Sequence, residues 1–340
     1  MFSLIYRFFN SNDGLAGKLQ QHVGSFKPSL KNIPKPHQCL PKNVYDEVTL
    51  IEPKHRGSLG VIYVGRFEGR LVALKVIPKK TRMNMMNDLK GMSWFGLFGS
   101  MVNKNIADMI GEIERTIEKE MDLKREYLWC IKLKKKLELN AFGAKVLTPI
   151  PELSSEKCFA YNYEHAKKLT DVKTEIRNNV CRRICLIFFY AMHCKNILLG
   201  DMNIGNVLYD EKHDKIILID YGCVNSLSVH ASRNLKLLYK SFKSYDAVHK
   251  LVRKWNGPNF MAKHIYKQAQ VFMSKTPVSF EHVPSMLDLF KNPLVYQCSI
   301  PPEITMSVRA LGQLVDVLKE MKATFTIRKE LDEWMMMATC

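Results

Sequence analysis

The chain has 340 residues, and 46% of them are hydrophobic, so it can build a sizeable core and a generally disordered state is excluded. Its 51 lysines and arginines outnumber 33 acidic residues, and the net charge of +18 favours an anionic partner such as a nucleotide, nucleic acid or an acidic membrane surface. Nine cysteines without a Cys-x-x-Cys pair favour reduced thiols over a zinc site.

Residues 1–44 are predicted to be an N-terminal extension and linker. Residues 1–20 fit either a helix docked on the body, which is favoured, or an amphipathic helix that touches a membrane. Prolines between residues 24 and 43 indicate an extended linker. The chain start lacks the apolar core of a secretory signal, and the apolar stretch 184–192 is too short to span a bilayer. We therefore expect a cytoplasmic or membrane-peripheral protein.

The next segment is predicted to be rich in β-strands. Strands are expected at residues 48–52, 61–64 and 71–77, joined by tight turns. Residues 79–105 are irregular, with a short helix expected around residues 94–101. A long helix with one apolar stripe is predicted from about residue 108 to 139, followed by strands near residue 146 and at 158–163.

Helices dominate the remainder, at about residues 174–194, 230–255, 259–274, 280–291 and 302–321. A β-hairpin over residues 207–220 interrupts them. The order of elements predicts an α+β fold with two unequal lobes, at residues 45–164 and 165–340.

A glycine-containing turn followed by a lysine is the first chemical signal. Gly57 and Gly60 precede one strand, and Lys75 ends the Val-Ala-Leu-Lys run of the next. Glycines let backbone N–H groups approach phosphates, and a lysine on an apolar strand needs an acidic partner. A lysine at a strand end, exposed to solvent, is the alternative reading.

The second signal joins two carboxylates and a carboxamide. Asp201 and Asn206 stand five residues apart, and Asp220 follows an aliphatic strand and precedes Tyr221-Gly222. Asn206 and Asp220 offer the oxygen ligands that Mg²⁺ requires. Asp201 could position or deprotonate an attacking hydroxyl group.

Together these motifs resemble a protein-kinase-like fold, and specifically the UbiB family of atypical kinases, also called aarF-domain kinases. The resemblance covers about residues 45–330. It is carried by four stretches: Gly57-Ser58-Leu59-Gly60-Val61-Ile62, Glu120-Met-Asp122-Leu-Lys-Arg-Glu126, Leu199-Gly-Asp-Met-Asn-Ile-Gly-Asn206 and Ile300-Pro-Pro-Glu-Ile-Thr-Met-Ser-Val-Arg309-Ala-Leu-Gly312.

The resemblance implies a role for each matching residue. Lys75 would pair with Glu126 and hold the α- and β-phosphates of ATP, Asp201 would be the catalytic-loop aspartate, and Asn206 and Asp220 would bind Mg²⁺. Further residues would bind the nucleotide, in the glycine-containing turn and at the junction of the lobes: Gly57, Ser58, Gly60, Glu164 and Ala166. Glu120 and Asp122 would belong to the family's acidic signature. Without the resemblance, five acidic residues of the long helix are equal candidates for Lys75: Glu112, Glu114, Glu118, Glu120 and Glu126.

Some positions depart from the family pattern. Lys18 is the only candidate for the upstream lysine that lies over the active site, and its motif is imperfect. Asn203 and Ile204 replace a His-Pro pair, and Tyr221 replaces phenylalanine. Because none of these changes removes a metal ligand or the phosphate lysine, a kinase or ATPase is favoured over a pseudokinase.

The resemblance implies ATP and Mg²⁺ as cofactors and work near isoprenoid-lipid, ubiquinone-type metabolism, with an anionic membrane lipid or a lipid-biosynthesis protein as further partner. No Ala-Pro-Glu segment follows Gly222 at kinase-like spacing, which weakens peptide phosphorylation as the activity. A small-molecule phosphotransferase of the aminoglycoside or choline kinase type and a catalytically silent nucleotide-dependent scaffold stay open. Nucleic acid is not favoured, because no nucleic-acid motif accompanies the lysines at 132–136.

Overall fold

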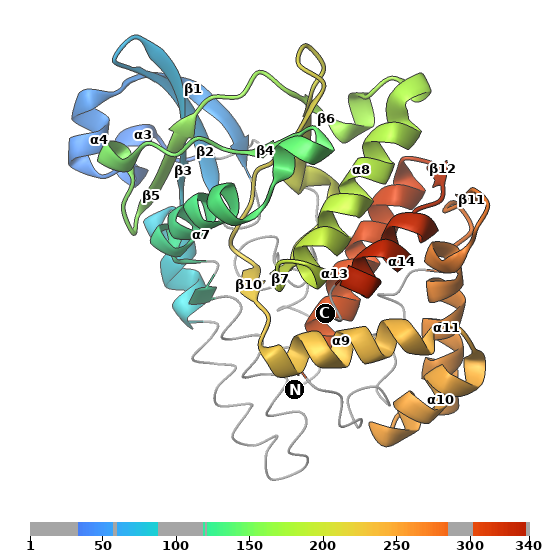
Figure 1. The fold of residues 1–340 in the computed structure, drawn as a ribbon. Coiled ribbons are helices and arrows are strands. Elements are labelled where there is room, and N and C mark those ends of the chain that lie inside the picture. The colour runs from blue at the N-terminus through green and yellow to red at the C-terminus, as the bar shows by residue number, and fades with distance from the viewer. Residues whose placement is uncertain (1–32, 57–59, 88–117, 120, 285–301, 338–340) are drawn as a thin grey trace. The chain divides into compact units, whose positions relative to one another are not determined.

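The computed structural model describes residues 33–56, 60–87, 118–119, 121–284 and 302–337. The chain divides into two compact units (Figure 1). Unit 1 runs to Ile131 and includes Leu147–Glu164, and unit 2 comprises Lys132–Val146 and the chain from His165 onward. No helix of the described part combines the length and apolar composition needed to cross a bilayer.

A four-stranded antiparallel sheet organises unit 1. Its strand order is β1 (Thr49–Arg56), β2 (Val61–Phe67), β3 (Arg70–Val76), β5 (Cys158–Asn162). The pleat of β3 directs Val72, Leu74 and Val76 into the apolar core. Lys75 therefore points to the opposite face. The predicted strands and the tight turn between β2 and β3 are confirmed.

The predicted extended linker is wrong in its last part. Residues 36–47 form two short helices, α3 (Pro36–Cys39) and α4 (Lys42–Glu47). Leu40 and Val44 bury their side chains in the core of unit 1, and the Tyr63 hydroxyl donates to the Pro34 carbonyl oxygen at 2.6 Å. A proline fits the first turn of a helix, so the prolines there start structure instead of preventing it. The predicted helix at 1–20 lies outside the described residues.

Helix α7 (Leu123–Lys136) is the main described part of the predicted long helix. Residues 118, 119 and 121 are helical too, but Asp122 is not, so the prediction of one continuous helix is wrong at this position. Its buried positions are Leu123, Glu126, Cys130 and Leu133, which share one face at helical spacing. The prediction that residues 79–105 are irregular is wrong for residues 79–87, which are helical, whereas the helix expected around 94–101 lies outside the described residues.

Unit 2 contains a second sheet. Its strand order is β4 (Ala144–Val146), β9 (Lys215–Leu218), β8 (Val207–Asp210), β6 (Lys167–Lys168), with β4 parallel to β9. Strands β8 and β9 form the predicted hairpin. Because β4 pairs with β9, residues 132–146 belong to the second unit, whereas the sequence had placed all of 45–164 in one lobe.

An arginine fastens this sheet to the central helix of unit 2, α8 (Thr174–His193). The Arg183 guanidinium donates to the carbonyl oxygens of Phe142 at 2.8 Å and Gly143 at 2.5 Å, and to Asp214 Oδ1 at 2.7 Å. The arginine also holds the pKa of the Asp214 carboxyl below its usual range. One buried cation thus ties the turn before β4 to the turn of the β8–β9 hairpin.

The other elements of unit 2 are mostly helical (Figure 1). The helix predicted at 230–255 is two helices, because Ser244 starts a new one by accepting the Ala247 N–H at 3.2 Å. Residues 280–284, the described part of the helix predicted at 280–291, are not helical. The remaining elements are α9 (Val229–Ser241), α10 (Tyr245–Lys254), α11 (Asn259–Met273), α13 (Pro302–Glu320), α14 (Arg328–Met337), β7 (Ile197–Leu199), β10 (Val224–Ser226), β11 (Val278–Ser279), β12 (Thr324–Phe325), and the 3₁₀ turns η1 (Leu139–Phe142), η3 (Leu169–Asp171) and η4 (Ile204–Asn206); η2 (Pro151–Leu153) is in unit 1.

Candidate active site

A buried ion pair forms the part of the site in unit 1. Lys75 Nζ of β3 lies 2.8 Å from Glu126 Oε1 of α7, and the Glu126 side chain is only 1% exposed. The resemblance implied this pairing, whereas the residues alone left five candidates. The alternative reading of Lys75 as a solvent-exposed lysine is wrong, because only 18% of its side chain is exposed and its ammonium group pairs with a buried carboxylate.

A periodicity signal could have selected Glu126. Glu126 lies three residues after buried Leu123 and four before buried Cys130, so it sits on the apolar stripe of α7. Glu118 is exposed, and Glu112, Glu114 and Glu120 lie outside the described residues. A carboxylate on the core stripe of a helix needs a cation, and Lys75 supplies one.

The other unit 1 assignments are only partly described. A Cβ at Gly60 would lie 3.7 Å from Lys75 Cε, so the end of the glycine turn adjoins the lysine. Asp122 accepts the backbone N–H of Arg125 at 3.0 Å and caps the start of α7. Glu164 and Ala166 are half-buried between β5 and β6, where the chain passes from unit 1 to unit 2. Lys18, Gly57, Ser58 and Glu120 lie outside the described residues.

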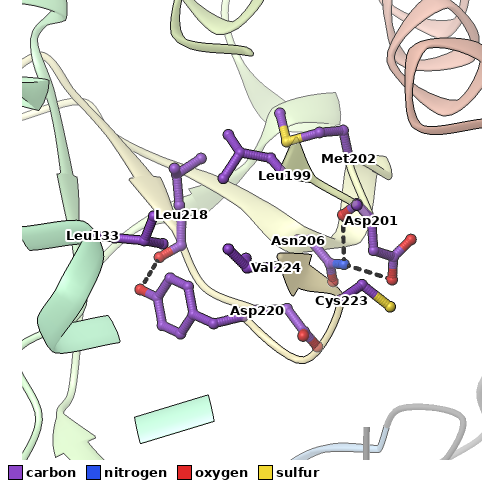
Figure 2. Close-up of a pocket in the computed structure, with 11 residues that line it drawn as sticks. Leu133, Leu199, Asp201, Met202, Asn206, Leu218, Asp220, Cys223 and Val224 are labelled. Carbon is purple, nitrogen blue, oxygen red and sulfur yellow. Dashed lines mark hydrogen bonds between the residues drawn. The ribbon is translucent and has the colours of Figure 1, made fainter. Parts of the chain in front are cut away.

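In unit 2, Asp201, Asn206 and Asp220 line one small pocket (Figure 2). Asp201 follows β7 and Gly200, and Asn206 ends the 3₁₀ turn η4. The Asn206 amide nitrogen donates to Asp201 Oδ2 and to the Asp201 carbonyl oxygen, both at 3.0 Å. These bonds close the loop on itself and bring both side chains to the pocket.

Asn203 helps to shape the same loop at a position that departs from the family pattern. Its Oδ1 accepts the Gly205 N–H at 2.9 Å and caps η4, while its Nδ2 donates to Asp201 Oδ1 at 3.0 Å. The asparagine therefore performs a defined structural task in place of the expected His-Pro pair.

Asp220 reaches the pocket from the end of β9. Its Oδ1 accepts the Gly222 N–H at 3.0 Å, which folds the Asp-Tyr-Gly turn around the carboxylate. Tyr221 is 1% exposed, and its hydroxyl donates to the Leu218 carbonyl oxygen at 2.5 Å. The tyrosine that replaces phenylalanine thus fastens the turn to the strand before it.

Close backbone packing joins the two loops of unit 2. Strands β7 and β10 pair antiparallel, with Leu199 opposite Val224. A Cβ at Gly200 would collide with the Cys223 carbonyl oxygen, so residue 200 has to be glycine for the segments before Asp201 and after Asp220 to approach.

Sequence reasoning missed one residue of this pocket's surroundings. Gln313 of α13 donates from Nε2 to Asp201 Oδ1 at 2.7 Å. Its sequence neighbours, 309–312, were recognised only as part of a closing helix. No local pattern marks a contact over 112 residues, so only the folded chain reveals it.

The donor set of the pocket suits Mg²⁺. Asn206 uses its amide nitrogen toward Asp201, which directs its amide oxygen elsewhere, and Asp220 contributes a carboxylate. Two hard oxygen ligands leave the remaining octahedral positions to water and phosphate oxygens, which is how proteins usually hold Mg²⁺. No described cluster of three or more histidine, cysteine, aspartate or glutamate residues offers an all-protein metal site.

Comparison with known proteins gives a consistent family. The model of the ABC1 atypical kinase-like domain matches residues 19–252. The "Probable protein kinase UbiB" of Vibrio atlanticus is 24% identical over 318 residues, which cover 84% of this chain and 57% of that protein. The protein of the same name from Actinobacillus pleuropneumoniae is 22% identical over 287 residues, which cover 75% of this chain and 52% of that protein. The chain thus spans a little over half the length of these relatives.

A solved structure shares the fold. It is described as the complex of Rv3197 with erythromycin from Mycobacterium tuberculosis, and it matches with a TM-score of 0.65 at 15% identity, over 97% of this chain and 94% of that one. The predicted α+β, kinase-like fold is confirmed. Since the family model covers more than half of the sequence, the chain belongs to the UbiB (ABC1) family of atypical kinase-like proteins.

Proposed function

We propose that this protein binds Mg·ATP and transfers its γ-phosphoryl group, as a UbiB-like atypical kinase or an ATPase. The observation that carries the proposal is the convergence of Asp201, Asn206 and Asp220 on one pocket of unit 2. The Lys75–Glu126 pair of unit 1 adds a lysine whose ammonium group is held for phosphate oxygens. These are the parts that protein-kinase-like phosphoryl transfer uses.

Each side chain has one task in the proposed reaction. Lys75 would hold the α- and β-phosphates, while Glu126 keeps its ammonium group in place. Asn206 and Asp220 would hold Mg²⁺, which when bound neutralises charge on the phosphates. Asp201 would orient the attacking hydroxyl group or water by accepting its hydrogen bond.

We further propose that the protein works at an anionic membrane surface, in isoprenoid-lipid metabolism of the ubiquinone type. Residues 229–273, which form α9, α10 and α11, contain nine lysines and arginines against one aspartate, a net charge of +8. Eight of the nine cations are exposed, and Lys236 is half-buried. Exposed apolar side chains accompany them, among them Val229 at 79%, Leu237 at 50% and Phe260 at 37%.

This basic region, α9–α11, has the composition of a lipid-binding surface. Each lysine or arginine near an anionic bilayer contributes about 1 kcal/mol, and apolar side chains between the cations can enter the headgroup layer. Nucleic acid would use the same cations but would gain little from an exposed valine or leucine. The charge and the apolar exposure together therefore favour a membrane.

Nucleotide binding is tested with the purified chain. We expect Mg·ATP and Mg·ADP to raise the melting temperature, and we expect Asp220→Asn to abolish Mg²⁺-dependent ATP turnover. The control is Asp246→Asn, which removes an exposed carboxylate from α10 of the same unit. A chain that gains no thermal stability from nucleotide, with or without Mg²⁺, would contradict the proposal.

The proposed binding to an anionic membrane is tested by vesicle flotation. We expect binding to phosphatidylglycerol-containing vesicles and not to pure phosphatidylcholine, and we expect salt to weaken it by screening. Arg233→Glu/Lys240→Glu should lose binding, whereas Lys134→Glu/Lys135→Glu, an equal charge change on α7, should retain it. Equal loss in both variants would mean that net charge, and not the basic region α9–α11, governs binding.

The same measurements separate the alternatives. Turnover that vesicles do not alter and that small hydroxylated acceptors stimulate would favour a small-molecule phosphotransferase. The silent scaffold would be favoured if the protein binds nucleotide without turnover and if Asp220→Asn leaves its membrane association unchanged.

A further inference from the structure

The Asp201 carboxylate is held by three amide donors. Asn203 Nδ2 at 3.0 Å and Gln313 Nε2 at 2.7 Å both donate to Oδ1, and Asn206 Nδ2 at 3.0 Å donates to Oδ2. Two of these donors belong to the loop that carries Asp201. Only Gln313 reaches it from a separate element, α13, so it alone of the three relates the aspartate to the helical body of unit 2.

Gln313 is buried, so its contact with Asp201 places a polar group in the interior of unit 2. The residue is 6% exposed, and its buried amide oxygen has no hydrogen-bond partner among the residues that the structure describes. A buried amide that is half satisfied is unfavourable, and methionine or leucine would fill similar space without that cost. The orientation of the amide is not ambiguous, since only its nitrogen can donate to a carboxylate.

We propose that Gln313 is a positioning residue, which fixes the side chain of Asp201 in the orientation needed toward the attacking hydroxyl group or water. The inference rests on the proposed function. The hydrogen bond from Gln313 to Oδ1 ties the aspartate side chain to α13, whereas Asn203 and Asn206 belong to the same loop as Asp201 and tie it only to that loop. Without Gln313 the loop keeps the hydrogen bonds from Asn203 and Asn206, but the Asp201 carboxylate no longer has a hydrogen bond to α13.

The test is Gln313→Met, which retains length and volume and removes the donor. We expect kcat for Mg·ATP turnover to fall about 10- to 100-fold, the size of effect that a small misplacement of a reacting group produces. KM for ATP and the thermal shift by Mg·ADP should stay within about twofold of the wild type, because Gln313 does not belong to the proposed nucleotide ligands.

Gln268 provides a matched control. It is a second buried glutamine of unit 2 and is 1% exposed, and within the described part of the chain neither its amide nitrogen nor its amide oxygen has a hydrogen-bond partner. Gln268→Met on α11 makes the same chemical change away from Asp201, so it should alter stability without altering kcat. A loss of turnover through general loosening of unit 2 would appear in both variants.

Two further measurements isolate the contact itself. In an Asp201→Asn background, Gln313→Met should cause no additional loss of turnover, because the two residues act as one unit. In the nucleotide-free protein, the side-chain NH₂ resonances of Gln313, assigned by their absence in Gln313→Met, should shift in Asp201→Asn. If Gln313→Met does not fold, Gln313→Glu replaces it and sets two carboxylates against each other.

The outcomes of the proposed function and of this inference differ. Wild-type turnover that Asp220→Asn abolishes establishes the first, and unchanged kcat in Gln313→Met would then overturn the second alone. Equal losses in Gln313→Met and Gln268→Met, or an additive effect in the Asp201→Asn background, would also overturn it. A wild-type chain without turnover overturns the proposed activity, and the positioning role with it.

Discussion

Lys75 and Glu126 depend on each other, because one member of the pair is almost fully removed from water. Glu126 is 1% exposed and Lys75 is 18% exposed, with 2.8 Å between their charged atoms. A buried carboxylate that loses its cation keeps the cost of its desolvation and loses the attraction that offsets it.

We therefore expect Lys75→Met to lower the free energy of unfolding by about 3 kcal/mol, the usual size for breaking a buried pair. The double variant Lys75→Met/Glu126→Met should recover most of that loss, since no charge then remains buried. Urea unfolding of the wild type, both single variants and the double variant measures the coupling. Equal stability of Lys75→Met and the wild type would contradict a buried pair.

Single residues also differ in whether the sequence alone can predict them. Lys75, Asp201, Asn206 and Asp220 could be proposed as site residues from the sequence because each stands in a short motif with fixed spacing. Gln313 was not, since its contact with Asp201 depends on how α13 packs against the loop.

At the scale of elements, a glycine and an arginine hold the second sheet to α8. Gly143 has φ of +58°, a conformation that L-residues rarely adopt. A Cβ at this position would also collide with the Arg183 guanidinium, which donates to the Gly143 carbonyl oxygen. The position is therefore restricted twice, by its backbone and by its neighbour.

Gly143→Ala should lower the free energy of unfolding of unit 2 by about 3 kcal/mol, combining backbone strain with the collision. Gly69→Ala, in unit 1, is the control for backbone strain: Gly69 has φ of +77°, and a Cβ there would meet no atom of the described residues within 4 Å. The control should lose only the backbone part, about 1 kcal/mol. Chemical denaturation that gives equal losses for the two variants would show that Arg183 adds no constraint.

A second glycine links structure to the proposed chemistry. Gly200→Ala should separate the paired strands β7 and β10 at Cys223, displacing Asp201 relative to Asp220. We expect Mg·ATP turnover to fall about 100-fold, as misplacement of reacting groups does, while circular dichroism changes little. Turnover at the wild-type level would show that the loops tolerate the wider spacing.

Elements also differ in how well the sequence predicts them. Strands β2, β3, β8 and β9 combine regular alternation with clear turns, and the sequence predicted all four. Helices α3 and α4 were read as a linker, since their prolines suggest extended chain and the burial of Leu40 and Val44 in the core leaves no local pattern. The sequence could not predict which sheet includes β4, because parallel pairing with β9 leaves no local pattern.

At the scale of the whole molecule, a buried histidine should make stability depend on pH. His193 is 5% exposed, stacks on Phe189 and meets the edge of Tyr239. Burial, with a smaller contribution from the positive charge of Lys236, lowers the pKa of His193 from 6.5 to about 4. The folded chain therefore excludes a proton that the unfolded chain accepts.

The sign follows from proton uptake. Between pH 6.5 and 4 the unfolded state binds more protons than the folded one, so the free energy of unfolding falls as the pH falls through this window. The contribution is complete above pH 6.5, and its loss amounts to about 3 kcal/mol at most. Melting curves of the full chain across this range should show it in the transition of unit 2.

His193→Phe, which keeps an aromatic ring between Phe189 and Tyr239, should flatten this pH dependence. His282→Gln, a change at an exposed histidine of the same unit, should leave it unaltered. The role of His193 is refuted if the phenylalanine variant retains the full wild-type slope.

The contact between Gly143 and Arg183 also constrains how this protein can diverge. A side chain at position 143 needs the volume that the guanidinium fills, while a smaller residue at 183 leaves the carbonyl oxygens of Phe142 and Gly143 without their donor. Neither position can change alone without loss, so homologous sequences should alter both together or neither. Pairwise covariation between positions 143 and 183, 40 residues apart, is the expected evolutionary trace of this contact.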